Sequence, residues 1–253
     1  MLIKMTTVKN IYDFINKIAP YNTQESFDNS GFMVGDFKKK VEKAIVCLDV
    51  TEKILYFAKK NKVDLIISHH PVIFSELKQI RSDSIVYKLI NNNISCLSAH
   101  TNFDKCDGGI DDVFANSLSL ENIENLKNGI GKIGNISEKL TPLDFAKFVK
   151  QRLKIEKIKI VCSNKPVKKI ATICGSGGSY IQDALFAGAD TIVTGDLKQE
   201  HFVDAHNFNY TLIDAGHFET EYGGVLKLKQ TLESIFKDIS FLILENENFI
   251  EII

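Results

Sequence analysis

The chain has 253 residues, a formal net charge of −1 and an apolar fraction of 44%. This length allows one large domain or two small ones, with enough apolar side chains for a sizeable core. The balanced charge gives no reason to expect a nucleic acid or an anionic membrane surface as a partner. No stretch approaches the length of a membrane span and no secretory signal is visible at the start of the chain, so we expect a cytoplasmic protein.

The five cysteines predict reduced thiols, because their number is odd and no pair is spaced as C-x-x-C. Cys106 lies in a polar loop beside Asp104, where a place next to a metal ion is an alternative to a structural role. The other four lie in apolar, strand-like runs, where buried reduced thiols are expected. These four are Cys47, Cys96, Cys162 and Cys174.

Strands and helices alternate in the first half of the chain. Thr6 or Thr7 can cap a first helix, whose apolar residues recur at helical spacing until Pro20 ends the pattern. The next expected elements are strands at 43–49, 64–68 and 94–99 and helices at 51–61, about 82–92 and 108–118. This order predicts a parallel sheet, whose carboxyl edge is where α/β proteins usually bind ligands.

Residues 121–140 differ in character, with Gly129, Gly131 and Gly134 between short apolar pieces, and we take them as the domain boundary. A second α/β block follows. Its expected helices lie at 141–153, 179–187, 198–206 and about 221–236, and its strands near 157–162, 169–174, 190–194, 210–214 and 240–244. We therefore predict an α/β protein with one domain at 1–125 and a second at 126–215.

Most histidines fall in three short polar motifs that each follow an apolar run. These are Ser68-His69-His70-Pro71, Ala99-His100-Thr101-Asn102-Phe103-Asp104 and Ala215-Gly216-His217-Phe218-Glu219-Thr220-Glu221. If a helix begins at His217, Glu221 lies four residues on, on the same face. Imidazole and carboxylate together are ligands for zinc, iron or manganese.

The adjacent imidazoles of His69 and His70 suit two neighbouring metal ions, which carboxylates such as Asp104 and Glu221 would bridge. A single histidine is usually a hydrogen-bonded structural residue, but three motifs at the ends of predicted elements favour a metal site. Two roles are open to His100. It is either a metal ligand or a residue outside the coordination sphere that orients a ligand or a bound water.

Two further features have equally plausible structural explanations. The turn Gly175-Ser176-Gly177-Gly178-Ser179 leads from a strand into a helix, where backbone N–H groups either bind a phosphate or simply form a tight turn. His201 and His206 lie on a predicted helix, for which a solvated face explains them as well as a function does.

Together the motifs resemble those of the GTP cyclohydrolase 1 type 2 homologues, also called the Ngg-one-interacting-factor-three-like family. Beside the histidine motifs, the resemblance includes Gly195-Asp196 and Gly223-Gly224, and it spans nearly the whole chain. It implies two α/β domains and a dinuclear metal centre. The implied metal ligands are His69, His70, Asp104, His217 and Glu221. Because Glu221 and its helix would complete this centre, residues 216–253 are expected to return to the first domain.

The resemblance also implies a ring-shaped homohexamer, built as a trimer of dimers. We predict a metal-dependent hydrolase that acts on a nucleotide or related phosphorylated compound, either at the purine ring or at phosphorus, with two divalent ions per chain. His100 is the candidate catalytic proton shuttle. The alternative is a non-catalytic metal-binding or regulatory ring that interacts with protein partners.

Overall fold

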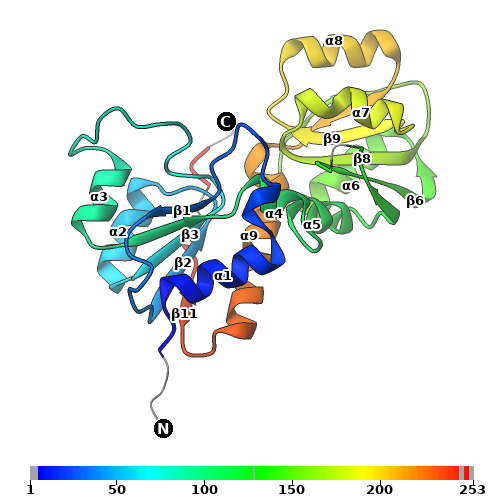
Figure 1. Cartoon of the computed structure of the whole chain (residues 1–253). Helices are drawn as coiled ribbons and strands as arrows, with labels where there is room; N and C mark the ends of the chain where they lie inside the picture. Colours follow the sequence, from blue (N-terminus) through cyan, green and yellow to red (C-terminus); the bar gives the residue numbers. More distant parts are fainter. Residues whose placement is uncertain (1–4, 128, 245–247, 251–253) are drawn as a thin grey trace. The chain divides into compact units, whose positions relative to one another are not determined.

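The computed structural model describes residues 5–127, 129–244 and 248–250. The chain forms two compact units (Figure 1). Unit 1 contains the chain up to Asp107 together with Val225–Phe249, and unit 2 contains Gly108–Gly224. The boundaries between the two units fall after residues 107 and 224. We predicted domain boundaries at 125 and 215.

Unit 1 is a five-stranded sheet in the order β1-β4-β3-β2-β11. Its strands are β1 (Gly31–Val34), β2 (Lys43–Cys47), β3 (Leu65–Ser68), β4 (Ser95–Ser98) and β11 (Ser240–Leu242). Its helices are α1 (Val8–Ile18), the short 3-10 helix η1 (Tyr21–Thr23), α2 (Glu52–Asn61), α3 (Ile85–Asn91) and α4 (Thr101–Lys105). All neighbours in this sheet are parallel except β1 and β4. In Figure 1, α2 and α3 lie on one side of the sheet and α1 on the other.

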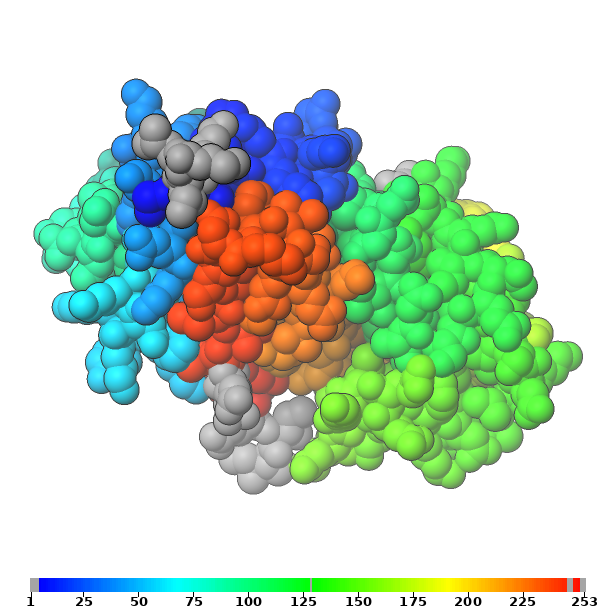
Figure 2. All heavy atoms as spheres, turned by 90° about the horizontal axis from the view of Figure 1, so that it is seen from below, coloured from blue at the N-terminus to red at the C-terminus, as the bar shows by residue number. Residues whose placement is uncertain are grey.

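The C-terminal segment returns to unit 1, as expected. β11 pairs in parallel with β2, and the ring of Phe236 meets Phe14 of α1 edge to face at 5.5 Å between centroids. Figure 2 shows this segment, in orange and red, against the blue N-terminal segment. The α/β fold class and the return of the chain are therefore confirmed.

Unit 2 is a six-stranded sheet in the order β5-β6-β8-β9-β10-β7. Its strands are β5 (Glu121–Asn125), β6 (Lys132–Leu140), β7 (Lys159–Val161), β8 (Val167–Ser176), β9 (Thr191–Gly195) and β10 (Thr211–Asp214). Its helices are α5 (Ile110–Ser117), α6 (Pro142–Leu153), the 3-10 helix η2 (Gly178–Tyr180), α7 (Ile181–Phe186), α8 (Gln199–Phe208) and the start of α9 (His217–Ile235). β8, β9 and β10 are parallel, and the outer strands are antiparallel to their neighbours.

Residues 121–140, which we took as the boundary, contribute β5 and β6 to the sheet of unit 2. The preceding helix α5 belongs to the same unit, and its buried Asp111 binds β8 and the segment before β6. One carboxylate oxygen accepts the N–H of Gly131 at 2.7 Å, and the other accepts the N–H of Cys174 at 3.2 Å. These buried bonds fasten the helix to β8 and to the segment before β6.

The cysteines are free thiols, as predicted. Cys47, Cys96 and Cys174 are buried, but the expectation of a buried Cys162 is wrong. The short strand β7 ends at Val161 on the outer edge of its sheet, so Cys162 begins an exposed turn. Among the described residues, no helix combines the length and the apolar character that crossing a membrane requires.

Candidate metal centre

In unit 1, the carboxyl ends of β3 and β4 bring the first two histidine motifs together. The two strands are parallel neighbours, with Ser68 opposite Ser98, so His69 and His100 leave the sheet at the same edge. The serine hydroxyls fix the backbone here: Ser98 Oγ donates to the carbonyl of His69, and Ser68 Oγ to that of His70, both at 2.7 Å. The sheet therefore fixes the backbone positions from which the histidine side chains extend.

Three imidazoles converge at this edge. The ring centroids of His69, His70 and His100 lie 4.9–5.5 Å apart, and each ring offers a nitrogen within 4.8 Å of the other two. Asp104 is buried beside them, with Oδ1 at 3.4 Å from His69 Nε2. These are donor types and spacings that suit a divalent cation.

Each of the three rings is oriented through its Nδ1 atom. His69 Nδ1 lies 2.8 Å from the carbonyl oxygen of Ala99, which can only accept, so Nδ1 carries the proton and Nε2 carries the lone pair. His70 Nδ1 lies 2.8 Å from Asp49 Oδ1, and His100 Nδ1 lies 2.7 Å from Asp28 Oδ1. Metal-binding histidines are typically held in this way, with the second nitrogen directed at the ion.

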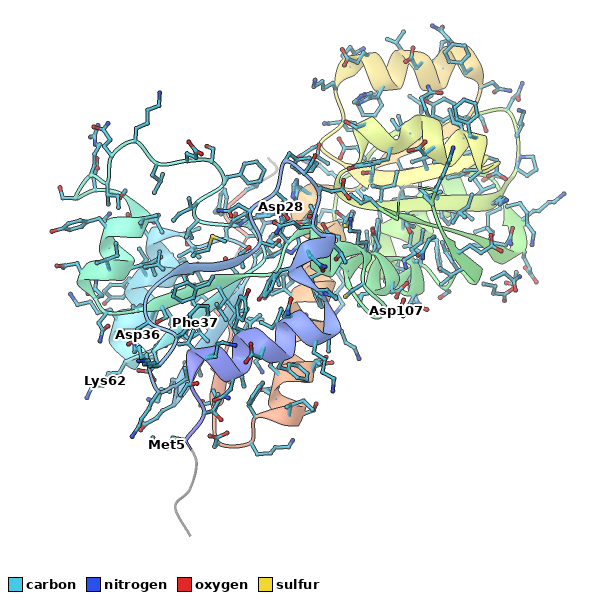
Figure 3. The ribbon with its side chains drawn as sticks, viewed as in Figure 1. Met5, Asp28, Asp36, Phe37, Lys62 and Asp107 are labelled. Carbon is cyan, nitrogen blue, oxygen red and sulfur yellow. The ribbon has the colours of Figure 1, made fainter. Side chains whose placement is uncertain are left out.

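Asp28, labelled in Figure 3, is the more enclosed of the two carboxylate acceptors, with a side chain that is 0% exposed, whereas that of Asp49 is 37% exposed. Burial alone would raise the pKa of this carboxyl, but hydrogen bonds from His100, Thr101 and Ser30 outweigh it and hold the pKa well below its ordinary value. Asp28 is therefore a buried carboxylate anion that fixes the ring of His100.

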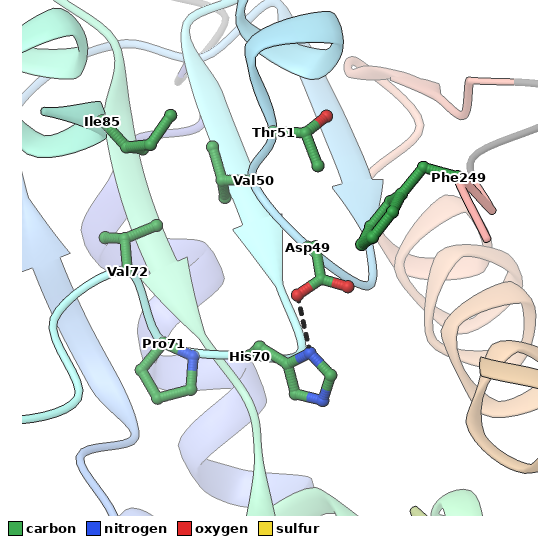
Figure 4. Close-up of a pocket in the computed structure, with 8 residues that line it drawn as sticks. All are labelled: Asp49, Val50, Thr51, His70, Pro71, Val72, Ile85 and Phe249. Carbon is green, nitrogen blue, oxygen red and sulfur yellow. Dashed lines mark hydrogen bonds and ion pairs between the residues drawn. The ribbon is translucent and has the colours of Figure 1, made fainter. Parts of the chain in front are cut away.

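A pocket of about 230 Å³ opens on the Asp49 side of His70 (Figure 4). Val50, Val72, Ile85 and Phe249 form much of its apolar lining. The hydrogen bond between His70 and Asp49 lies at its polar end.

In unit 2, the third motif forms a second group of possible ligands. α9 begins at His217, so the expected helical spacing holds: His217 Nε2 lies 3.0 Å from Glu221 Oε2. His217 Nδ1 lies 2.6 Å from Asp196 Oδ2, at the end of β9. Glu221 is buried, whereas the Asp196 side chain is 56% exposed.

The glycine-rich turn packs against this pair. Gly175 has φ +57°, and a Cβ there would lie 2.2 Å from Glu221 Oε1 and 3.1 Å from His217 Nε2. Its N–H donates to Thr220 Oγ1 at 3.0 Å, and that of Gly177 to Thr194 Oγ1 at 2.9 Å. Because both amides bind side chains of the protein, the tight-turn interpretation is favoured over phosphate binding.

The remaining candidates lie apart from these groups. His201 Nδ1 accepts the N–H of Lys198 at 3.1 Å and so caps α8, and His206 is exposed on the same helix. Cys106 Sγ lies 3.5 Å from the carbonyl oxygen of Phe103 and belongs to neither group of nitrogen and carboxylate donors.

Sequence reasoning missed the acceptors Asp28, Asp49 and Asp196. Asp28 looked like part of a turn, and Asp49 like the end of a strand. Gly195-Asp196 is recognisable in the sequence only as a motif of the family. Two of the three could have been found from their position in the sequence. Asp49 and Asp196 each closely follow the carboxyl end of a parallel strand.

The profile of a protein family described as Duf34/NIF3 (NGG1p interacting factor 3) matches residues 6–248. The chain belongs to this family. A "GTP cyclohydrolase 1 type 2 homolog" of Clostridium perfringens is 32% identical over 249 residues, which cover 93% of this chain and 95% of that protein. A "GTP cyclohydrolase 1 type 2" of Helicobacter pylori is 33% identical over 235 residues, covering 91% and 93%.

Solved structures agree with this membership. The Staphylococcus aureus hypothetical protein SA1388 superposes with a TM-score of 0.91 at 26% identity, covering 99% of this chain and all of that one. Reduced HcgD from Methanocaldococcus jannaschii gives a TM-score of 0.84 at 30% identity, covering 95% and 98%. The resemblance seen in the motifs is thus confirmed for the Duf34/NIF3 family.

Proposed function

We propose that this Duf34/NIF3 protein binds two divalent metal ions and is a metal-dependent hydrolase of a nucleotide or related phosphorylated compound. The observation that carries the proposal is the convergence of His69, His70 and His100, each with Nδ1 held by an oxygen acceptor. Such an arrangement directs nitrogen lone pairs to one place, which a structural histidine does not require.

The proposed ligands are those of the sequence prediction: His69, His70 and Asp104 from unit 1, and His217 and Glu221 from unit 2. Support comes from each group separately, because each combines imidazole with a buried carboxylate. The mixed nitrogen and oxygen donors, without thiolate, fit zinc, iron or manganese. When bound, such ions lower the pKa of a coordinated water and polarise the bond to be broken.

His100 is proposed to carry the proton during hydrolysis. Its Nδ1 is bound to the buried Asp28 carboxylate, so its Nε2 is the atom that can meet a water or a leaving group. Asp28 would stabilise the ring while it holds the extra proton. The printed names of the Clostridium and Helicobacter relatives make GTP the first substrate to test.

We also propose a homohexamer, a trimer of dimers, in the cytoplasm. Phe186 and Phe208, on α7 and α8, are 87% and 69% exposed, which favours their burial against another chain. The free thiols fit a reducing compartment. The exposed rings and the free thiols fit the alternative function equally well. That alternative is a non-catalytic metal-binding ring with protein partners.

Turnover of GTP by the metal-loaded protein tests the hydrolase, with product detected by chromatography for both ring opening and phosphate release. Wild type should turn over GTP, lose activity with EDTA and regain it with metal, and His217→Ala should be inactive. If protein with a full complement of metal leaves GTP and other nucleotides unchanged, the hydrolase proposal is wrong and the non-catalytic alternative replaces it.

A further inference from the structure

Two aromatic rings stand half open to solvent beside the histidines of unit 1. Phe27 is 56% exposed and Phe74 is 50% exposed, with ring centroids 6.4 Å apart and planes tilted by 32°. The Phe74 centroid lies 6.1 Å from that of His100. Large apolar surface is costly to leave in water, so a pair of open rings next to a polar cluster needs an explanation.

Hydrogen bonds hold the residues that adjoin these rings in place. Phe27 directly precedes Asp28, whose carboxylate binds the His100 ring and accepts Thr101 N–H at 3.1 Å. Asn29 Nδ2 donates to the carbonyl of Ile73 at 2.6 Å, which ties the Phe27 segment to the Phe74 segment. The residues next to both rings are therefore fixed, so the rings form a preorganised surface at the rim of the cluster.

We propose that Phe27 and Phe74 form a stacking site for a planar nitrogen heterocycle, such as a nucleobase. Stacking of a base on an aromatic side chain contributes about 1–3 kcal/mol and depends on the π-face rather than on the identity of the base. A ring stacked here would place its substituents beside His100. The site therefore selects nucleotides over phosphate esters that lack an aromatic base, and its role in turnover rests on the proposed function.

Binding of GMP and of ribose 5-phosphate tests the site, because the two ligands share a sugar phosphate and differ in the base. Titration calorimetry on the metal-loaded full chain should show tighter binding of GMP. The double substitution Phe27→Leu with Phe74→Leu keeps apolar bulk but removes the rings. It should weaken GMP binding about tenfold and leave ribose 5-phosphate unaffected.

The matched control is Tyr56→Leu, which removes an exposed ring on α2 of unit 1. It should not change GMP binding. Equal affinity of the wild type for the two ligands, or unchanged GMP binding in the double variant, would overturn the stacking site. A changed oligomeric state in ultracentrifugation with unchanged GMP binding would also overturn it and assign the rings to a contact between chains.

The calorimetry and the assay of GTP turnover together separate this inference from the proposed function. If the protein binds metal and turns over GTP but binds GMP and ribose 5-phosphate equally well, only the stacking site is wrong. Ring-dependent binding of GMP without any turnover would support the stacking site and count against the hydrolase.

Discussion

The two groups of candidate ligands are built differently. In unit 1, His69 and His100 follow parallel strands, and their acceptors are a backbone carbonyl and the fully buried carboxylate of Asp28. In unit 2, His217 lies on the first turn of a helix and is held by Asp196, a carboxylate that is 56% exposed. His69 and His100 are thus held by acceptors within the folded core, whereas Nδ1 of His217 is held by a carboxylate at the surface.

The buried carboxylates differ as well. Hydrogen bonds outweigh burial at Asp28 and hold its pKa low, whereas burial prevails at Asp111 in unit 2 and raises its pKa to about 6. Two buried aspartates thus have opposite effects on stability as the pH changes. This contrast and the one above can each be tested by substitution.

The largest effect is expected at Asp28. Asp28→Ala leaves the donors of His100, Thr101 and Ser30 without their acceptor inside the protein, which should lower the free energy of unfolding by about 3 kcal/mol. Denaturant titration of metal-free protein measures it. Asp13→Ala, which removes an exposed ion pair with Lys9, is the control and should cost about 0.5 kcal/mol. Equal losses in the two variants would contradict a core role for the unit 1 group.

The next effect concerns pH and Asp111. The pKa of Asp111 in the folded protein is about 6, above the ordinary 3.8. The protonated carboxyl therefore makes its full contribution to the free energy of unfolding below pH 3.8, and this contribution is lost as the pH rises through 6. Between about pH 4 and pH 7, the unfolding free energy of wild type should fall relative to Asp111→Asn by about 2 kcal/mol. Urea titrations with EDTA measure the difference, and a constant difference would contradict it.

Gly175→Ala should affect both stability and metal binding. The positive φ costs an alanine about 1 kcal/mol, and the added Cβ displaces the Glu221 carboxylate. Gly108→Ala is the matched control, since its φ is +73° and no atom lies within 4 Å of its Cβ. Both variants should lose similar stability, but only Gly175→Ala should lower zinc affinity, by about tenfold. Equal zinc affinities of the two variants would show that the turn at Gly175 does not position His217 and Glu221 for metal binding.

The smallest change in stability is expected at Asp196. Asp196→Ala should lower zinc affinity by about 10–100-fold because His217 loses the partner of its Nδ1. Because this carboxylate is exposed, the free energy of unfolding should change by less than about 1 kcal/mol. A loss of stability as large as that of Asp28→Ala would remove the contrast between the two groups.

The sequence was sufficient to predict the elements that place these groups. Apolar runs identified β3 and β4, and the histidines that follow them marked the edge of the candidate site. The i, i+4 spacing places His217 and Glu221 on one face if a helix begins at His217; α9 does begin there, although the pattern predicted its start only at about 221. These features depend on local periodicity, which a single sequence displays directly.

Other features depend on contacts between distant segments, which periodicity does not encode. Asp28 reaches His100 across 72 positions in the chain, so it could only be recognised as a turn residue. The boundary stretch 121–140 was rich in glycine, yet strand pairing with β8 includes it in the sheet of unit 2. Cys162 was expected to be buried because its run is apolar, but the strand ends one residue earlier.

The metal content of the purified protein tests the central claim most directly. Elemental analysis after reconstitution should find about two ions per chain in wild type, and fewer in both Asp104→Ala and His217→Ala, with folding of each variant checked by circular dichroism. One substitution lies in each unit, so a loss in both would show that both groups hold metal. Wild-type protein that binds no metal under these conditions would contradict the metal centre and the hydrolase proposal with it.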